Sequence, residues 1–186
     1  RIRVFNGMGM GTTMFSVWRS ERPKEKPIED GLAEWMDVQL KSAGRTQEVS
    51  FQTEDGWTLY GTLRTPDSTS EVTAAPGVIL IHSSFTDRHI YDHLAETMVK
   101  RGLTVLNFDS RGRGKSIGKG ELLDLPPDER NKTYIDARAA VNFLSSLPGA
   151  GRIGLLGADR GATYALRAAI EDPRVGALTL MTTLVS

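Results

Sequence analysis

The sequence predicts an α/β fold, built on a mostly parallel sheet that is flanked by helices and led by an antiparallel hairpin. Four apolar runs, at 78–81, 103–108, 153–156 and 175–181, are continuous rather than alternating. Continuous runs are typical of parallel strands that are covered on both faces. Helical periodicity separates these runs, and an alternation of strand and helix indicates the α/β class.

The leading hairpin is expected over residues 48–64. Apolar and polar residues alternate on both sides of Asp55-Gly56, a pair that marks a tight turn. One face of the hairpin is therefore expected to be buried. The apolar positions on that face are Val49, Phe51, Trp57, Leu59 and Leu63.

Two helices are predicted between the apolar runs. Each has one apolar stripe and ends at residues that stop a helix, Gly102 for the first and Pro148-Gly149 for the second. The stripe of the first helix is Ile90, Leu94 and Met98, and that of the second is Ala137, Ala140, Val141 and Leu144.

Residues 1–47 differ from the rest and are assigned to a separate N-terminal part, which leaves 48–186 as the core. An amphipathic helix is expected over 29–43. The segment 1–27 has two interpretations: an extended arm that packs on another surface, or an anchor that rests on a membrane or on a partner in a complex. The anchor would use Phe5, Met8, Met10, Met14, Phe15 and Trp18, with Arg19, Arg22, Lys24 and Lys26 at its edge.

Composition limits the classes of partner and site. The chain of 186 residues has 23 basic and 23 acidic side chains, so its net charge is about zero. A nucleic-acid partner is not expected, because such proteins usually carry a basic surplus. No apolar run approaches the ~20 residues that span a bilayer. Without cysteine the chain has no disulfide and no zinc–thiolate site, and the compartment stays undetermined.

The stretch GADRG, residues 157–161, joins an apolar strand to a helix rich in small residues. It has the form of a nucleophile elbow, G-x-S-x-G, with Asp159 in the place of the serine. The two glycines let strand and helix approach closely, and the strained turn lifts the residue between them above the sheet. We therefore expect Asp159 in a strained turn, with its carboxylate near the amides that open the helix.

Three further stretches precede the elbow in order: VILIHSSF at 78–85, NFDSRGRGKSIG at 107–118 and DARAAVNFLSSL at 136–147. With the hairpin and the elbow, they resemble the α/β-hydrolase fold, and most of all its dienelactone-hydrolase and peptidase-like esterase branch. The resemblance covers about residues 48–183 and rests on order and spacing rather than on any single motif.

The resemblance implies an oxyanion hole made by the backbone amides of Arg160 and Ser83. It also leaves two interpretations of Asp159. In the haloalkane-dehalogenase and epoxide-hydrolase branches, an aspartate at the elbow attacks carbon and forms an ester intermediate. Those branches usually place a tryptophan next, whereas here Arg160 would pair with the carboxylate. The alternative is therefore that the nucleophile has been lost.

The histidines do not follow the order of this fold, in which nucleophile, acid and histidine succeed one another along the chain. No histidine follows Asp159. His82 ends a strand at the edge where ligands gather in open α/β sheets. A structural or oxyanion-loop role is favoured for it over that of a general base. The chain is thus expected to be catalytically incomplete, as if truncated after the elbow half of the fold.

His89 and His93 have the i, i+4 spacing of a zinc pair, for which Asp87 or Asp92 would be the third ligand. The sequence lacks the HExxH glutamate, so two histidines on a helix surface are favoured. We expect no metal and no cofactor.

Two functions are compatible with these residues. One is a non-catalytic subunit that uses the fold for binding or assembly, with 1–27 as its docking element. The other is a fragment of an ester or acyl hydrolase, or of an Asp-nucleophile hydrolase, whose acid and histidine lie outside this chain. In both cases the strand at 175–185 is an open sheet edge. We expect it to be covered by another protein chain, by the protein's own missing C-terminal half or by the arm at 1–27 folded back.

Overall fold

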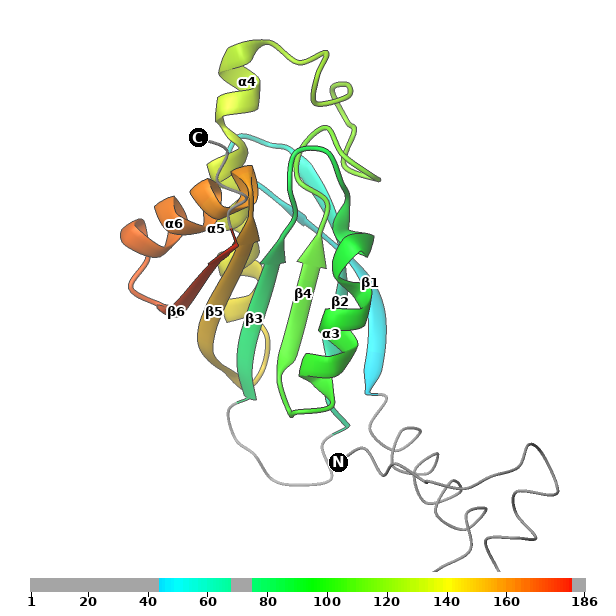
Figure 1. Cartoon of the computed structure of the whole chain (residues 1–186), viewed down its shortest axis with the longest axis vertical. Helices are drawn as coiled ribbons and strands as arrows, with labels where there is room; N and C mark the ends of the chain where they lie inside the picture. Colours follow the sequence, from blue (N-terminus) through cyan, green and yellow to red (C-terminus); the bar gives the residue numbers. More distant parts are fainter. Residues whose placement is uncertain (1–43, 68–74, 182–186) are drawn as a thin grey trace, which may run out of the picture. The chain divides into compact units, whose positions relative to one another are not determined.

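A computed structural model describes residues 44–67 and 75–181, which form a six-stranded sheet with the order β1-β2-β4-β3-β5-β6 (Figure 1). Strands β1 and β2 form an antiparallel hairpin, and β2 is also antiparallel to β4. The other contacts, β4 with β3, β3 with β5 and β5 with β6, are parallel. The predicted hairpin and four parallel strands are therefore confirmed. The strands are β1 (Arg45–Gln52), β2 (Thr58–Thr65), β3 (Ala75–Ile81), β4 (Thr104–Phe108), β5 (Ala150–Ala158) and β6 (Val175–Met181).

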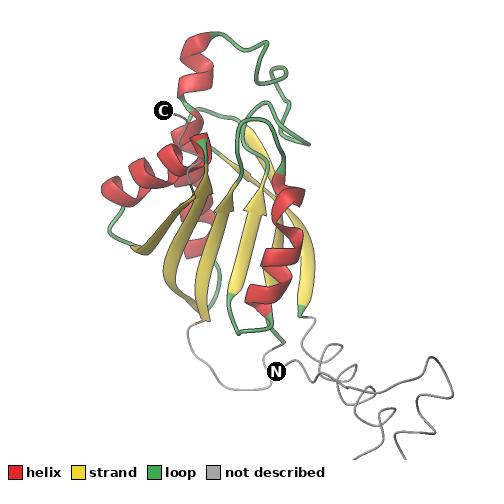
Figure 2. Ribbon diagram, viewed as in Figure 1, coloured by secondary structure: helices red, strands yellow, loops and turns green. Residues whose placement is uncertain are grey.

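Helices cover both faces of the sheet (Figure 2). α3 (Asp92–Val99) packs on one face, and α5 (Thr133–Ser145) and α6 (Arg160–Glu171) pack on the other. Strand β3 shows why its sequence is continuously apolar: Ile79 and Ile81 belong to the core under α5, while Leu80 belongs to the core under α3. The short helices η1 (Arg88–Tyr91) and α4 (Pro127–Asn131) lie in the loops that follow β3 and β4.

The two predicted helix stripes have different outcomes. The stripe of α5 is confirmed, since all four of its predicted residues are buried. In the first helix the predicted Leu94 and Met98 are partly buried and pack on the core, beside the fully buried Ala95 and Val99. The third predicted residue, Ile90, is 61% exposed. It lies in the 3-10 turn η1, whose tighter winding puts it out of phase with the α-helical stripe.

Several expectations fall outside the described residues. They are the arm at 1–27, the amphipathic helix at 29–43 and the end of the last strand beyond Met181. Strand β1 begins at Arg45 rather than at residue 48. In the part of the chain that the structure describes, no helix has the length and apolarity needed to cross a membrane.

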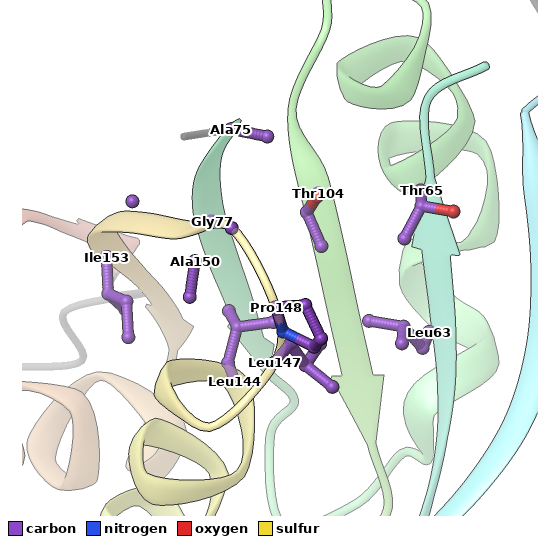
Figure 3. Close-up of a pocket in the computed structure, with 12 residues that line it drawn as sticks. Leu63, Thr65, Ala75, Gly77, Thr104, Leu144, Leu147, Pro148, Ala150 and Ile153 are labelled. Atoms are coloured by element: carbon purple, nitrogen blue, oxygen red, sulfur yellow. The ribbon is translucent and has the colours of Figure 1, made fainter. Parts of the chain in front are cut away.

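An apolar cavity of about 200 Å³ lies near the amino ends of the parallel strands (Figure 3). It is lined by residues such as Gly77, Thr104, Leu144 and Ile153, and none of its lining residues is titratable. Because Asp159 follows the carboxyl end of β5, this cavity is at the opposite end of the sheet from the predicted site.

Candidate active site

Strand β5 passes into helix α6 through one strained residue. Asp159 has φ 53° and ψ −121°. Among the described residues it is the only one other than glycine with a positive φ. L-residues rarely adopt this region, because Cβ then crowds the backbone. The strained strand-to-helix turn expected at Asp159 is therefore confirmed.

The two glycines of the elbow allow a contact that no side chain could enter. A Cβ on Gly157 would lie 2.3 Å from the carbonyl oxygen of Gly161. A Cβ on Gly161 would lie 2.5 Å from the carbonyl oxygens of both Ile81 and His82. The first turn of α6 thus lies directly against the end of β3.

The carboxylate of Asp159 does not cap the helix. Asp159 is exposed, and its side chain makes no hydrogen bond to the amides that open α6. This differs from our expectation, because a capping side chain reaches those amides from a β-region backbone, which Asp159 does not have. The backbone itself is fixed: the Asp159 N–H donates to the carbonyl of Met181 at 2.9 Å, and the Asp159 carbonyl accepts from the N–H of Ala162 at 3.0 Å.

Asp159 and Arg160 are both exposed, and the expected ion pair between their side chains does not form. Arg160 is the first residue of α6, so its N–H has no partner within the helix. Ser83 follows His82, whose carbonyl touches Gly161. The two backbone amides assigned to an oxyanion hole therefore belong to segments that are in contact.

His82 is a buried residue with both ring nitrogens occupied. Its Nδ1 lies 2.7 Å from the carbonyl oxygen of Ser83, and its Nε2 accepts from the N–H of Ser110 at 3.0 Å. The carbonyl requires Nδ1–H and the amide requires a lone pair on Nε2, so the ring is a neutral Nδ1–H tautomer. Burial lowers the pKa of His82 and so favours this form. The geometry agrees with a structural role and leaves no lone pair for a general base.

The other two histidines lie on η1 and α3. His89 Nδ1 is 2.8 Å from Asp92 Oδ2, and the second oxygen of Asp92 accepts from Arg64 at 2.7 Å. His93 is exposed. Within 44–67 and 75–181, no group of three or more acidic or histidine side chains is arranged to hold a metal ion.

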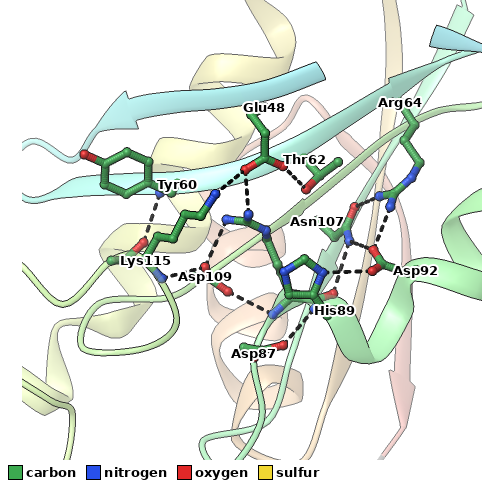
Figure 4. A network of polar contacts seen from close by, with 12 residues as sticks. Glu48, Tyr60, Thr62, Arg64, Asp87, His89, Asp92, Asn107, Asp109 and Lys115 are labelled. Atoms are coloured by element: carbon green, nitrogen blue, oxygen red, sulfur yellow. Dashed lines mark hydrogen bonds and ion pairs between the residues drawn. The ribbon is translucent and has the colours of Figure 1, made fainter. Parts of the chain in front are cut away.

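A network of ion pairs joins the loops that follow β3 and β4 (Figure 4). Arg88 is 1% exposed and donates to Asp109 at 3.0 Å and to Glu48 at 2.6 Å. Asp109 also accepts the backbone N–H groups of Arg88 and Lys115, each at 2.9 Å. One carboxylate therefore fixes the start of η1 and the turn after β4 to the same point.

A second cluster joins the β4 loop to α5 and to the hairpin turn. The guanidinium of Arg111, which is fully buried, pairs with Asp136 and with Asp55, both at 2.8 Å. Burial raises the pKa of Asp136 to about 6, against the attraction of Arg111. Hydrogen bonds from Arg111 lower the pKa of Asp55 to about 2. These charges position the loops at the carboxyl edge of the sheet.

Sequence reasoning missed the residues that line a small cavity beside His82 and Ser83. They include Arg113 from the β4 loop, Thr133 from α5 and Tyr164 from α6. No local pattern unites them, because they come from three separate elements. The only signal in the sequence was the position of Arg113 between Gly112 and Gly114. In the structure both glycines have a positive φ.

The sheet order, the helices on both faces and the elbow after β5 define a protein of the α/β-hydrolase fold. Residues 78–185 match the model of the family described as the alpha/beta hydrolase family. The chain belongs to this family.

Individual relatives are enzymes of related classes. The chain is 33% identical to the thiohydrolase aneE of Aspergillus aculeatus, with 69% of this chain and 38% of that protein covered. It is 36% identical to the polyketide transferase claH of Penicillium crustosum, with 69% of this chain and 41% of that protein covered. The esterase Pf2001 of Pyrococcus furiosus has a similar structure, with a TM-score of 0.59, 26% identity, and 77% of this chain and 51% of that chain covered. The chain thus spans about half the length of these relatives or less.

We predict that Gly161→Ala lowers the free energy of unfolding by about 1–3 kcal/mol, since its methyl group would overlap two backbone oxygens. Urea unfolding measures this. The control is Gly118→Ala, where the nearest atom is 4.0 Å away and little change is expected. Equal effects of the two substitutions would mean that α6 does not lie against β3 as described.

His82 should make stability depend on pH. Its folded-state pKa is lower than the ordinary 6.5, so the unfolded chain binds more protons below that value. The stabilisation relative to His82→Gln is therefore expected to be complete at about pH 7 and to decrease towards about pH 5. Chemical denaturation of both proteins at several pH values gives this difference in the free energy of unfolding. Asp136 titrates in both proteins, so its contribution cancels in the difference. A difference that is independent of pH would contradict the buried neutral ring.

Proposed function

We propose that this chain carries the nucleophile-elbow half of an ester or thioester hydrolase, with Asp159 as the reacting group. The observation that carries the proposal is an exposed, unpaired carboxylate on a strained backbone at the end of β5. Strained residues other than glycine are concentrated at active sites. Two relatives are named as a thiohydrolase and a polyketide transferase, which supports an acyl thioester or ester as the substrate class. Membership of the dienelactone-hydrolase and peptidase-like esterase branch is part of the same proposal.

The step that suits this geometry is acyl transfer to Asp159. A carboxylate oxygen attacks the carbonyl carbon, the bond from that carbon to its oxygen or sulfur leaving group breaks, and the leaving group takes a proton from solvent. The backbone amides of Arg160 and Ser83 stabilise the negative charge that develops on the carbonyl oxygen. The product is a mixed anhydride on Asp159, and water restores the carboxylate.

Rapid turnover needs a general base to activate that water. His82 has no free lone pair, and His89 is paired with Asp92. The proposal therefore assigns the histidine and the second acid to residues outside these 186, either in another chain or in further sequence of the same protein.

A second candidate is the binding or assembly subunit, and one observation favours it. Strand β6 is at the end of the sheet and, within the described residues, pairs only with β5. Its Leu180 and Met181 are 41% and 42% exposed. An unpaired edge with apolar side chains is a surface on which other chains assemble. In this interpretation the segment 1–27 supplies a further contact, with a partner or a membrane.

Chemical trapping tests the first candidate. We expect no turnover of p-nitrophenyl acetate above background, and none after Asp159→Ser, because a serine without a base stays protonated. In the presence of hydroxylamine, however, attack on the Asp159 carbonyl of the mixed anhydride expels acetate and leaves Asp159 as a hydroxamate, which peptide mass spectrometry detects. Attack on the acetyl carbonyl instead releases acetohydroxamate and restores the carboxylate. Asp159→Asn is the matched control and should give no hydroxamate at that position.

One result would decide against this candidate. A folded chain that forms no hydroxamate at Asp159 would remove its role as nucleophile and leave the assembly subunit. Multiple turnovers that Asp159→Ala abolishes would instead support Asp159 as the nucleophile and contradict only the assignment of the base to residues outside these 186.

The assembly candidate predicts that the isolated chain is not a free monomer. Sedimentation velocity should show self-association that increases with protein concentration, and Leu180→Lys with Met181→Lys should reduce it, since lysine on an edge strand opposes pairing. The control is Leu166→Lys with Ile170→Lys, two exposed positions on α6. A stable monomer at all concentrations would contradict this prediction.

A further inference from the structure

The apolar cavity at the amino ends of the parallel strands has no part in the site at Asp159. It lies where α5 and β2 end and where β3, β4 and β5 begin, and its volume is about 200 Å³. Protein interiors are closely packed, and voids larger than a water molecule are few. An apolar cavity of about 150 Å³ stays free of water and binds benzene. The space beside α5 is therefore large enough for a ligand of that size.

The pairing of the strands and a missing side chain leave this space open. Between β3 and β5 the register shifts from Ala75 opposite Ala150 to Gly77 opposite Ile153, so two residues of β5 lie opposite one of β3. Such a bulge bends the strand that carries it. A Cβ on Gly77 would lie 2.7 Å from Cδ2 of Leu144, so a side chain at that position would displace the leucine. The cavity is thus a consequence of how the sheet and α5 meet.

The walls of the cavity suit an apolar occupant rather than water. Figure 3 shows the side chains of Leu63, Leu144 and Leu147 around this space. Among the described residues that line it, the only side-chain polar atoms are the hydroxyl oxygens of Thr65 and Thr104. A bound water needs two to four polar partners. Two separate hydroxyl groups are few for a cavity with room for several waters.

The backbone groups around the cavity are also occupied. The N–H of Ala150 donates to the carbonyl of Leu147, and the N–H of Ala75 donates to the carbonyl of Gly149, both at 3.1 Å. The N–H of Leu147 donates to the carbonyl of Leu144 at 3.4 Å. The turn that follows α5 therefore leaves few polar groups that an occupant would need to satisfy.

The charge of an occupant is restricted by the end of α5. Leu144 belongs to the last turn of this helix, and the C-terminal end of a helix carries partial negative charge. None of the described lining residues is basic, so no cation would compensate a bound anion. A carboxylate would leave water without gaining a partner, which is unfavourable. The cavity is therefore suited to an uncharged molecule.

We propose that this cavity is a binding site for a small uncharged apolar molecule, about the size of one aromatic ring. The site is at the opposite end of the sheet from Asp159. It does not depend on the reaction proposed there, and its test measures binding and not activity.

The test is a titration of the whole chain with benzene, followed by the carbon-13 methyl NMR signals of Leu63, Leu144 and Ile153. A saturable shift of these signals is expected. The methyl signals of Leu166, which is exposed on α6 and does not line the cavity, should stay in place. Benzoate should bind more weakly than benzene by roughly tenfold or more, because its charge would be buried without a partner.

A substitution that fills the cavity should abolish binding. Thr104 is half-buried at the start of β4, and phenylalanine is well tolerated in strands. Thr104→Phe should weaken benzene binding by roughly tenfold or more, because the ring would occupy the space that the ligand needs. The matched control is Thr46→Phe, the same exchange at an exposed position of β1 that does not line the cavity. It should bind benzene as the parent chain does.

Three results would overturn the proposal. The first is a set of lining methyl signals in the parent chain that do not shift to saturation with benzene, a result that needs no variant to fold. The second is parent-like benzene binding by Thr104→Phe with a folded NMR spectrum. The third is benzoate that binds as tightly as benzene, which would exclude a site for uncharged molecules.

Discussion

The contact between Gly161 and the carbonyl oxygens of Ile81 and His82 determines the arrangement of the candidate site. With no side chain between them, α6 begins directly against the end of β3. The chain must then leave β5 and enter the helix within one residue, and only a positive φ at Asp159 achieves that reversal. Because of this one approach of helix and strand, the first turn of α6 is in contact with His82, the residue that precedes Ser83.

Paired charges hold the loops around that contact, together with the buried Leu122, Leu125 and Tyr91. Arg88 and Asp109 connect the β3 loop to the β4 loop, and Arg111 connects the β4 loop to α5. Each buried arginine is neutralised by more than one carboxylate: Arg88 also pairs with Glu48, and Arg111 also pairs with Asp55 and Glu129. The same β4 loop supplies the Ser110 amide that keeps His82 neutral. The loops, the ring and the strand ends therefore form one interdependent unit.

Much of the fold was predictable, because the information is local. Continuous apolar runs gave the parallel strands, and the glycines at 157 and 161 indicated the turn at Asp159. Leu94 and Met98 pack on the core as expected. The prediction for Ile90 was wrong because a 3-10 turn at Arg88–Tyr91 has no distinctive composition. In the site, the direction of the Asp159 carboxylate depends on a backbone angle, not on residue type.

Other features of the site depend on groups that are distant in the sequence. The His82 ring is hydrogen-bonded to its neighbour Ser83 and to Ser110, which is distant in the sequence. No short motif could therefore predict the bond to Ser110. The burial of Arg113 also could not be predicted from the sequence. A charged residue in a glycine-rich loop is expected to be solvated, and only the folded loop shows that two of its nitrogens are buried.

The backbone at Asp159 places opposite demands on one position. Glycine adopts a positive φ without steric cost, so it would suit the turn better than any other residue. A change to glycine would relax the elbow and remove the carboxylate in the same step. Stabilisation of the turn by glycine at residue 159 and retention of the carboxylate there are therefore mutually exclusive.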